Sequence, residues 1–445
     1  MPVGVVDHYK QNSLLSSRAN HITAGAYDYA WNNNYTNRYF LSILSSTPVT
    51  YNGTTYAGKA KYVYHPYIKN FSGNYGFSTY EEDHTVEGDY RQYLITEIGD
   101  SCFAGAQFAE SSALPAALTR IGNYAFYNAA YAKNNLTLPS QLTVIGTSAF
   151  ENSKITGEIK IPASVTYIGD KAFFTTTYSS LYFPVFNQSI TLGKHVWSVG
   201  SERPVWVPNE YAYGYLNAIN SSWNNASAYA SSLNVYIKPY ASSVPFSSVV
   251  PTYMSQSGID AYIATAYDKS NPTHQLTLTK VNHVVANTGM ILTGLTPDQE
   301  YRIVRGNNNA TTPATNYLVG TPSSYVWIED QTVGYYWDGT AATPHFIWPT
   351  DSYASWYGQA YLKLSSTEGS GIDEVYTNLW PKQTIQRGDI NGDNTVDVSD
   401  VNSIINIILG KASTSDYAGN ADLTGDGNVD VSDVNAVINI ILGKA

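Results

Sequence analysis

The sequence has few charges and almost no cysteine. Only 13% of its 445 residues are Asp, Glu, Lys or Arg, whereas globular proteins average about 25%. Cys102 is the one cysteine, so no disulfide can form within the chain, and this leaves the redox compartment open. The 24 Lys and Arg residues form no basic patch, which argues against a nucleic-acid-binding protein.

Long apolar segments are also missing. No run approaches the roughly 18 apolar residues that argue for a membrane-spanning helix, so we expect no transmembrane segment. The first residues, MPVGVVDHYK, lack the basic and apolar regions of a signal peptide. Two interpretations stay open at this point: an intracellular protein, or a secreted protein whose signal peptide is absent from this sequence.

No catalytic motif stands out. The sequence has no HExxH, GxSxG or P-loop pattern and no Cys/His set at metal-ligand spacing. Glu81 or Glu82 with Asp89 could form the carboxylate pair of a glycoside hydrolase, but many other pairs of acids would serve equally well. We therefore expect a protein that is not an enzyme and has no catalytic residues, with a glycoside hydrolase as the alternative.

What the chain has in abundance is strand-forming residues. It contains 39 Tyr, and 43% of its residues are hydrophobic. Aromatic residues favour β-strands, so the sequence predicts a mainly β protein. Its length predicts about two to four domains.

Residues 90–210 contain a repeat of 23 or 24 residues. Each copy has an aliphatic residue followed by glycine, and an aromatic residue five positions after the aliphatic one. The aromatic residues are Phe103, Phe126, Phe150, Phe173 and Trp197. A unit this short cannot bury its own apolar face, so it stacks on its neighbours as a solenoid. We expect one strand per repeat, a turn at each Ile-Gly step, the aromatic ring inside, and Cys102 buried at a position that is alanine in other copies.

The repeat pattern resembles the BspA-like class of leucine-rich repeats, which is found in bacterial surface proteins. We place the repeats at 91–234, where the segment VWVPNEYAYGYLNA from Val205 resembles the terminating unit of that family. The resemblance implies an adhesin or a scaffold for protein binding. It assigns no ligand to any single residue, so the ligand of these repeats, protein or glycan, stays unknown.

The segments on either side of the repeats are also rich in strand signals. Residues 1–90 are expected to form an N-terminal region and repeat cap, which includes a hairpin around Asn52-Gly53 in VTYNGTTY. Short strand-like runs separated by turn residues over 235–365 predict an antiparallel sandwich or barrel. Residues 366–387 are polar and contain glycine, so they are expected to be a linker.

An acidic stretch of twelve residues occurs twice near the end of the chain, as DINGDNTVDVSD and DLTGDGNVDVSD. Its oxygen-bearing residues fall at the spacing of an EF-hand calcium loop. We expect two calcium ions, with Thr395 and Asn428 binding through their backbone carbonyls and Thr424 weakening the second site. The expected ligands are Asp389, Asn391, Asp393, Thr395, Asp397 and Asp400 in one loop, and Asp422, Thr424, Asp426, Asn428, Asp430 and Asp433 in the other.

An apolar helix is expected after each acidic loop. The spacing predicts that Val401, Ile404, Ile405 and Ile408 form one buried face, and that Val434, Val437, Ile438 and Ile441 form the other. Gly410 and Gly443 are natural stops for these helices.

A calcium loop followed by a helix, twice in tandem, resembles a type I dockerin, over residues 388–445. The resemblance implies calcium-dependent docking to a cohesin-like module or scaffold protein outside the cell. Carried over by position, the partner-binding residues are Val398, Ser399, Ile405 and Asn406 in the first copy, and Val431, Ser432, Ile438 and Asn439 in the second. The near identity of the two copies is compatible with docking through either face.

The expected fold class is thus mainly β and multidomain: a short leucine-rich-repeat solenoid, an antiparallel β-sandwich-like module, and a small α-helical calcium-binding dockerin. We expect a non-catalytic binding protein, secreted or at the bacterial cell surface, because weak calcium sites fill at extracellular calcium levels. The alternative is a carbohydrate-active or glycan-binding component of a polysaccharide-degrading complex. A structural spacer also stays open.

Overall fold

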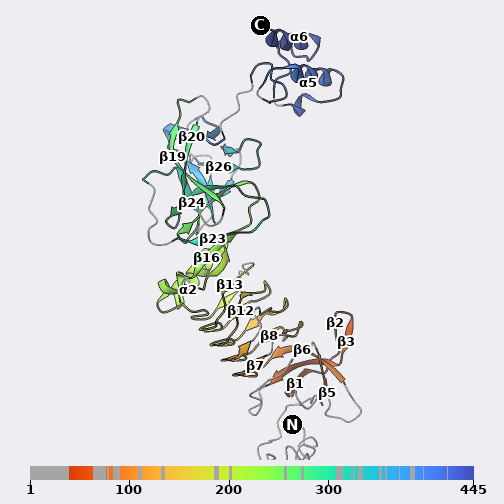
Figure 1. The fold of residues 1–445 in the computed structure, drawn as a ribbon, viewed down its shortest axis with the longest axis vertical. Helices are drawn as coiled ribbons and strands as arrows, with labels where there is room; N and C mark the ends of the chain where they lie inside the picture. The colour runs from red at the N-terminus through yellow and green to blue at the C-terminus, as the bar shows by residue number, and fades with distance from the viewer. Residues whose placement is uncertain are drawn as a thin grey trace, which may run out of the picture.

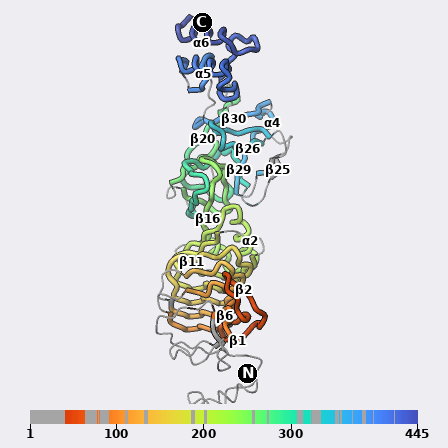
Figure 2. Tube along the Cα trace, turned by 90° about the vertical axis from the view of Figure 1, so that its right-hand side faces the viewer, coloured from red at the N-terminus to blue at the C-terminus, as the bar shows by residue number. Residues whose placement is uncertain are grey.

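The computed structural model in Figure 1 describes the chain from residue 40 onward, with gaps. The described ranges are 40–63, 77, 80–83, 91–108, 113–131, 136–184, 190–199, 203–254, 258–271, 275–306, 314–321, 323, 326–328, 334–349, 353–355, 358–369, 371–380, 386–393, 395–417 and 419–444. Figures 1 and 2 show the stacked repeats between an N-terminal sheet and a β-module. The expected mainly β, multidomain fold is confirmed.

One sheet runs along the repeats in the order β1-β4-β6-β8-β10-β12-β14, with β5 paired to β6. From β4 to β14 neighbouring strands are parallel, whereas β1 and β5 pair in antiparallel fashion. The strands are β1 (Phe40–Ser45), β4 (Gly58–Val63), β5 (Tyr80–Asp83), β6 (Arg91–Ile98), β8 (Arg120–Ile121), β10 (Val144–Ile145), β12 (Tyr167–Ile168) and β14 (Thr191–Leu192).

The repeats carry more than the one strand each that the sequence predicts. A second parallel ladder joins β11 (Glu158–Lys160), β13 (Ser180–Tyr182) and β15 (Val205–Pro208), and a third pairs β7 (Gln107–Phe108) with β9 (Ala130–Tyr131). The aliphatic residue of each Ile-Gly step ends a strand, and the chain turns only after it. Strands of two or three residues are too short to show the alternation by which a strand is recognised in sequence.

The glycine of each repeat lies directly against the glycine of the repeat before it. A Cβ on Gly146 would lie 2.6 Å from the carbonyl carbon of Gly122, and one on Gly169 would lie 2.7 Å from that of Gly146. Contacts below 3.0 Å do not occur for real Cβ atoms. The repeat therefore needs glycine here because successive backbones approach too closely for any side chain.

The aromatic residues of the repeats lie inside the solenoid, as the sequence predicts, and three of them stack on one another as a spine. The rings of Phe126 and Phe150 are 5.2 Å apart and nearly parallel at 3°, and those of Phe150 and Phe173 are 5.3 Å apart at 4°. All three side chains are fully buried. Cys102 is buried in the same core, as the sequence predicts, and burial raises the pKa of its thiol well above the usual value.

The predicted N-terminal hairpin is confirmed. Strands β2 (Val49–Tyr51) and β3 (Thr54–Tyr56) pair in antiparallel fashion. Asn52 and Gly53 have φ of 47° and 80°, and positive φ at both central residues defines a type I′ turn. The first 39 residues of the predicted N-terminal region and repeat cap lie outside the described residues.

The solenoid ends in short helices and passes into a second sheet. Helices η2 (Asn209–Tyr211), α2 (Ala212–Ser222) and α3 (Ala226–Ala230) follow β15. The sheet runs β11-β13-β15-β16-β23-β18-β21. Its last strands are β16 (Leu233–Ile237), β23 (Tyr301–Arg305), β18 (Thr252–Tyr253) and β21 (His283–Val284).

The β-module is built on a sheet of nine strands that are antiparallel except for the pair β20–β30. In order they are β17 (Ser243–Phe246), β22 (Met290–Thr293), β19 (Asp260–Asp268), β20 (Gln275–Val281), β30 (Glu374–Thr377), β27 (His345–Ile347), β26 (Gly334–Asp338), β29 (Gln359–Lys363) and β24 (Leu318–Thr321). Alternate residues of β22 face opposite cores: Met290 and Leu292 face the core shared with the repeats, and Ile291 faces a second core inside the module.

The predicted linker at 366–387 differs from the structure. Helix α4 (Ser366–Gly369) and strand β30 lie inside it, and β30 pairs with both β20 and β27. Val375 is fully buried in the second core, and Trp380 packs against that core. The module therefore extends to residue 380, because its sheet needs a strand that comes from beyond the run of strands predicted. A separate pair of strands, β25 (Val326–Ile328) and β28 (Tyr353–Ser355), completes the module.

Candidate functional site

The two acidic loops and the helices after them have the same local structure. Helix α5 (Val398–Ile408) and helix α6 (Val431–Ile441) each begin with a capping box, in which Asp397 and Asp430 are the N-cap residues. Gly410 and Gly443 follow them with φ of 67° and 66°, so the predicted glycine stops are confirmed. A 3₁₀ turn, η3 (Thr414–Asp416), lies between the two copies.

The first loop is closed by hydrogen bonds to its buried end carboxylates. Asp389 and Asp400 are both fully buried. Asp400 Oδ1 accepts from the backbone N–H groups of Ile390 and Asn391 at 2.7 and 3.0 Å, while Asp400 Oδ2 accepts from that of Asp397 at 2.9 Å. Asp389 Oδ1 accepts from the backbone N–H of Gly392 at 2.8 Å. The last loop residue therefore fixes both the start of the loop and the start of α5.

The second loop is closed in the same way by its last residue, with Thr424 in the place of Asn391. Asp433 Oδ1 accepts from the backbone N–H groups of Leu423 and Thr424, each at 2.9 Å. The Thr424 hydroxyl adds a hydrogen bond of 3.1 Å to the same oxygen. Burial raises the pKa of Asp433, but these hydrogen bonds and the one from Asp430 outweigh it and leave the pKa below its usual value. The carboxylate is therefore held ionised.

The chemistry of the loop residues fits calcium. Each loop offers carboxylate, amide or hydroxyl oxygens at five positions and a backbone carbonyl at a sixth, and calcium takes six to eight oxygen ligands. In the conformation described, several of these carboxylates point at N–H groups of their own loop. Across the described ranges, which omit Asn394, no three Asp, Glu, His or Cys side chains lie close enough together to hold a metal ion.

The helices meet through only part of the face predicted to be buried. Ile404 and Val437 are fully buried between them, together with Ile390, Ala421 and Leu423, and partly buried residues surround this core. Val401 and Val434 are among those partly buried residues, as predicted. The prediction is wrong for four other residues, which are exposed: Ile405, Ile408, Ile438 and Ile441. Ile405 and Ile438 directly follow the buried Ile404 and Val437 and turn away from the other helix, whereas Ile408 and Ile441 are the last residues of their helices.

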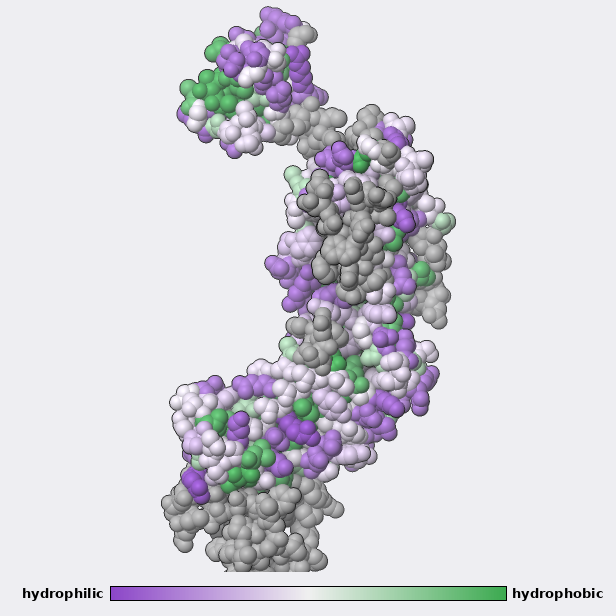
Figure 3. All heavy atoms as spheres, turned by 180° about the vertical axis from the view of Figure 1, so that it is seen from behind, coloured by the Kyte–Doolittle hydropathy of each residue, from purple (hydrophilic) through white to green (hydrophobic). Residues whose placement is uncertain are grey.

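Each helix therefore exposes an apolar face of the same composition. We call the two faces the α5 face and the α6 face. The α5 face comprises Val398 at 65% exposure, Ile405 at 36%, Ile408 at 38% and Leu409 at 60%; the α6 face comprises Val431 at 64%, Ile438 at 37%, Ile441 at 38% and Leu442 at 57%. The hydrophobic patch of the C-terminal domain is visible in Figure 3.

The predicted partner-binding residues partly coincide with these faces. Val398, Ile405, Val431 and Ile438 belong to them. Ser399 lies beside the loop and accepts a hydrogen bond of 2.7 Å from Asn391, whereas the exposed Ser432 donates one of 2.6 Å to Asp430. Asn406 is half-buried and Asn439 is exposed. Sequence reasoning missed Leu409 and Leu442, although an apolar residue directly before the stop glycine in both copies was a visible signal.

The glycosidase pair considered from sequence cannot be located. Glu81 and Glu82 lie on β5, but their side chains and the whole of Asp89 are outside the described residues. None of the described helices is both long and apolar enough to cross a membrane.

Two segments of the chain match families of known proteins. Residues 92–198 match the BspA type leucine rich repeat region, in six copies. Residues 387–442 match the type I dockerin domain. Both are non-catalytic domains, and type I dockerin domains bind calcium.

Comparisons with whole proteins give weaker similarity. A leucine rich cell surface protein from Faecalibacterium prausnitzii is 14% identical, with a TM-score of 0.12 over 37% of this chain and 79% of its own. A leucine-rich repeat protein from Bacteroides ovatus is also 14% identical, with a TM-score of 0.13 over 38% of this chain and 64% of its own. No curated protein matches the chain. The chain therefore combines a BspA-type leucine-rich repeat region with a type I dockerin domain.

Proposed function

We propose that this is a secreted, non-catalytic binding protein that is anchored to an extracellular scaffold through its C-terminal domain. One observation carries the proposal: the α5 face and the α6 face expose the same apolar residues at the same positions of two repeated units. Exposed apolar patches on a small soluble domain mark sites of protein contact. The partner is a cohesin-like module, and the repeats with the β-module bind a protein or another surface ligand.

Calcium belongs to this proposal as the ion that makes the loops rigid. One ion per loop would be held by the residues at positions one, three, five, seven, nine and twelve, from Asp389 to Asp400 and from Asp422 to Asp433. Bound calcium offsets the repulsion between neighbouring carboxylates. The side chains that hold the ion also cap α5 and α6, so the ion would fix the helices that carry the two faces.

A glycan-binding role is the second candidate, and one pair of residues favours it. Tyr124 and Tyr127 are 45% and 38% exposed on the solenoid, and their rings are 5.9 Å apart. Exposed aromatic rings offer an apolar face on which a sugar ring can stack. A glycan array and a polysaccharide hydrolysis screen, run on the full chain, separate the candidates: specific glycan binding that Tyr124→Ala abolishes would favour the second, and cleavage would contradict a non-catalytic protein.

The two faces are expected to act as alternatives in docking. With Ile405→Asp or Ile438→Asp alone, the other face is intact, and the Kd for a cohesin module that binds the full chain should rise no more than about threefold. In the double variant the Kd should rise at least about 30-fold, because a binding hot spot is then missing from both faces. Calorimetry of the full chain against a panel of cohesin modules, with and without EDTA, measures this.

Leu379→Asp serves as the matched control, because Leu379 is 38% exposed in the β-module and lies outside both faces. Its Kd should equal that of the unmodified chain. If none of the cohesin modules binds in calcium, or if the double variant binds as well as Leu379→Asp, the proposed docking surface is wrong.

A further inference from the structure

The repeat region and the β-module share a strand. Strand β16 pairs in parallel with β15, the last strand of the solenoid ladder, and in antiparallel fashion with β23 of the module. Beyond β23 the same sheet continues to β18 and β21. The sheet therefore passes from the repeats into the module without a free edge between them.

The hydrophobic core is also continuous across this boundary. One cluster of buried side chains contains residues of the repeats, such as Phe150 and Val205, and residues of the module, such as Phe246, Leu292 and Ile303. Two independent domains joined by a linker would each have a core of their own. Here the module fills the apolar end of the solenoid.

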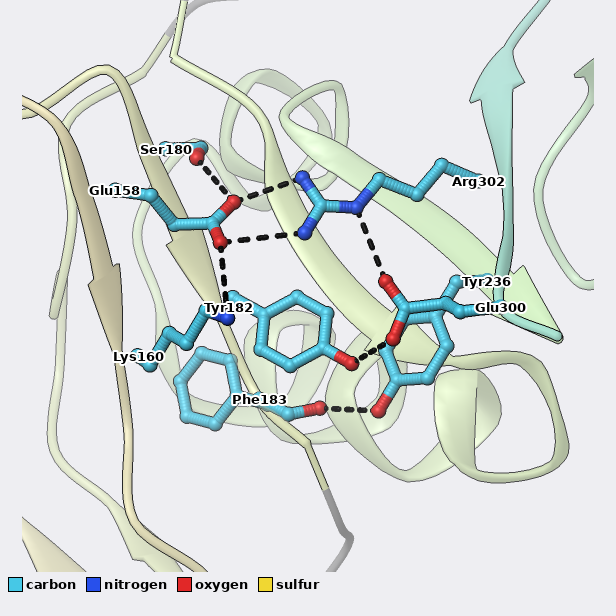
Figure 4. Close-up of polar contacts among 8 residues, drawn as sticks. All are labelled: Glu158, Lys160, Ser180, Tyr182, Phe183, Tyr236, Glu300 and Arg302. Atoms are coloured by element: carbon cyan, nitrogen blue, oxygen red, sulfur yellow. Dashed lines mark hydrogen bonds and ion pairs between the residues drawn. The ribbon is translucent and has the colours of Figure 1, made fainter. Parts of the chain in front are cut away.

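An ion-pair cluster crosses the outer face of the shared sheet (Figure 4). The guanidinium of Arg302, on β23, donates to Glu158 of β11 through two nitrogens, at 2.8 and 3.2 Å, and to Glu300 through Nε at 3.2 Å. It also lies over the rings of Tyr182 and Trp206, 5.0 and 5.3 Å from their centroids. A planar guanidinium can make a bidentate ion pair and stack on aromatic rings together, which a lysine cannot do.

Two tyrosines extend this cluster between the repeats and the module. The hydroxyl of Tyr182 donates to Glu300, and that of Tyr236 donates to the carbonyl of Phe183 at 2.7 Å. The rings of Tyr182 and Tyr236 stack 4.9 Å apart. Side chains separated by more than one hundred residues in sequence are thereby joined in one network.

A second cross-link is made by Asn209, which is 3% exposed. Its Nδ2 donates to the carbonyls of Ser247 and Gly358, at 2.7 and 3.2 Å. Gly358 has φ of 79°, and a Cβ on it would lie 2.5 Å from Asn209 Nδ2. The end of the solenoid is thus tied to two distant segments of the module.

We propose that the β-module is the C-terminal cap of the solenoid. The described residues from 40 to 380 then unfold as one cooperative unit, and Arg302 is the main side chain that links the repeats to the module. A solenoid exposes an apolar face and a strand edge at each end, and it needs a cap there. The β-module supplies both the strand and the core residues that cover this end.

The ionisation of Glu158 agrees with this arrangement. Burial raises the pKa of its carboxyl, but the hydrogen bonds from Arg302 and Ser180 outweigh burial and leave the pKa below its usual value. A carboxyl with a lowered folded-state pKa adds stability above its unfolded pKa, and this contribution is lost as the pH falls through the folded pKa. The facing charged groups are Arg302 of β23 and Lys160 of β11.

Hydrogen exchange of the full chain, with calcium present, tests the proposal. In the unmodified chain, the most protected amides of β13 and of β22 should exchange with equal free energies of opening, because both open only when the whole unit unfolds. Arg302→Met removes the guanidinium that pairs with Glu158 and Glu300, and it should raise both exchange rates by the same factor, at least about tenfold. Arg302→Lys keeps the charge and should give a smaller, equally shared increase.

Lys280→Met is the matched control, since Lys280 makes an exposed cross-strand ion pair of 2.6 Å with Asp260 inside the module. Its exchange rates should be unchanged. The proposal is overturned if β13 and β22 open with clearly different free energies in the unmodified chain, or if Arg302→Met accelerates exchange only in the module. If Arg302→Met does not fold, the exchange rates of β13 and β22 are compared in Arg302→Lys instead. An increase confined to the module would again overturn the proposal.

Discussion

Replacing Phe150 with alanine should destabilise the repeat region by about 3–5 kcal/mol, the usual cost of removing a fully buried aromatic ring. The ring lies between those of Phe126 and Phe173, at 5.2 and 5.3 Å. Both neighbours are held by their own turns of the solenoid, so they cannot move together to fill the cavity. Chemical denaturation of the full chain, followed by hydrogen exchange of peptides from the repeats, measures the free energy of unfolding.

Tyr127→Ala is the control for that variant, because Tyr127 is an aromatic residue of the neighbouring repeat that is 38% exposed. It should cost less than about 1 kcal/mol, as most surface substitutions do. Equal losses for the two variants would mean that the stacked rings are not the core of the solenoid. Phe150→Leu, which keeps part of the volume, should fall between them.

Removing calcium is expected to abolish the protection of α5 and α6 against hydrogen exchange, and to leave the repeats unchanged. A domain this small has little core to fold on burial alone, so we expect metal binding to supply much of its folding free energy. The domain core contains five fully or nearly fully buried hydrophobic residues, Ile390, Ile404, Ala421, Leu423 and Val437. Exchange in EDTA, and again after calcium is restored, measures the effect.

Substitutions in one loop at a time test whether each loop binds one calcium ion. Asp400→Asn and Asp433→Asn each remove a buried carboxylate that closes one loop and caps one helix, and native mass spectrometry should then show one calcium ion per chain in place of two. Asp416→Asn, in the exposed turn η3 between the copies, should retain both ions. A domain that stays equally protected in EDTA, or that loses both ions in Asp416→Asn, would disprove the expected sites.

The sequence predicted the features that depend on residues close together in the chain. These features are the buried aromatic residues of the repeats, the buried Cys102, the hairpin at Asn52-Gly53 and the helix stops. They follow from spacing or from backbone conformation, so the pattern alone reveals them. The second ladder of the repeats was missed because strands such as β11 have only three residues. Strand β30 was assigned to a linker because its pairing with β20 joins residues about one hundred positions apart.

The candidate docking site was predicted only in part, for a related reason. Periodicity shows that α5 and α6 are apolar, but the position of the partner helix decides which residues are covered. Ile404 meets α6 and is buried, whereas its neighbour Ile405 points away and is exposed. The exposed leucines at 409 and 442 belong to the same two faces and complete them.

The close contact of successive glycines has a consequence for how such proteins diversify. In each turn of the solenoid the glycine packs against the backbone of the glycine in the turn before, as Gly122, Gly146 and Gly169 show. Every turn therefore makes the same contact with both of its neighbours. Duplicating or deleting one 23- or 24-residue unit therefore creates no new kind of contact and moves the two ends of the solenoid by only about 4.8 Å, the spacing of neighbouring strands. The length of the solenoid can thus change in evolution in small fixed steps, while the sequences of its two ends stay the same.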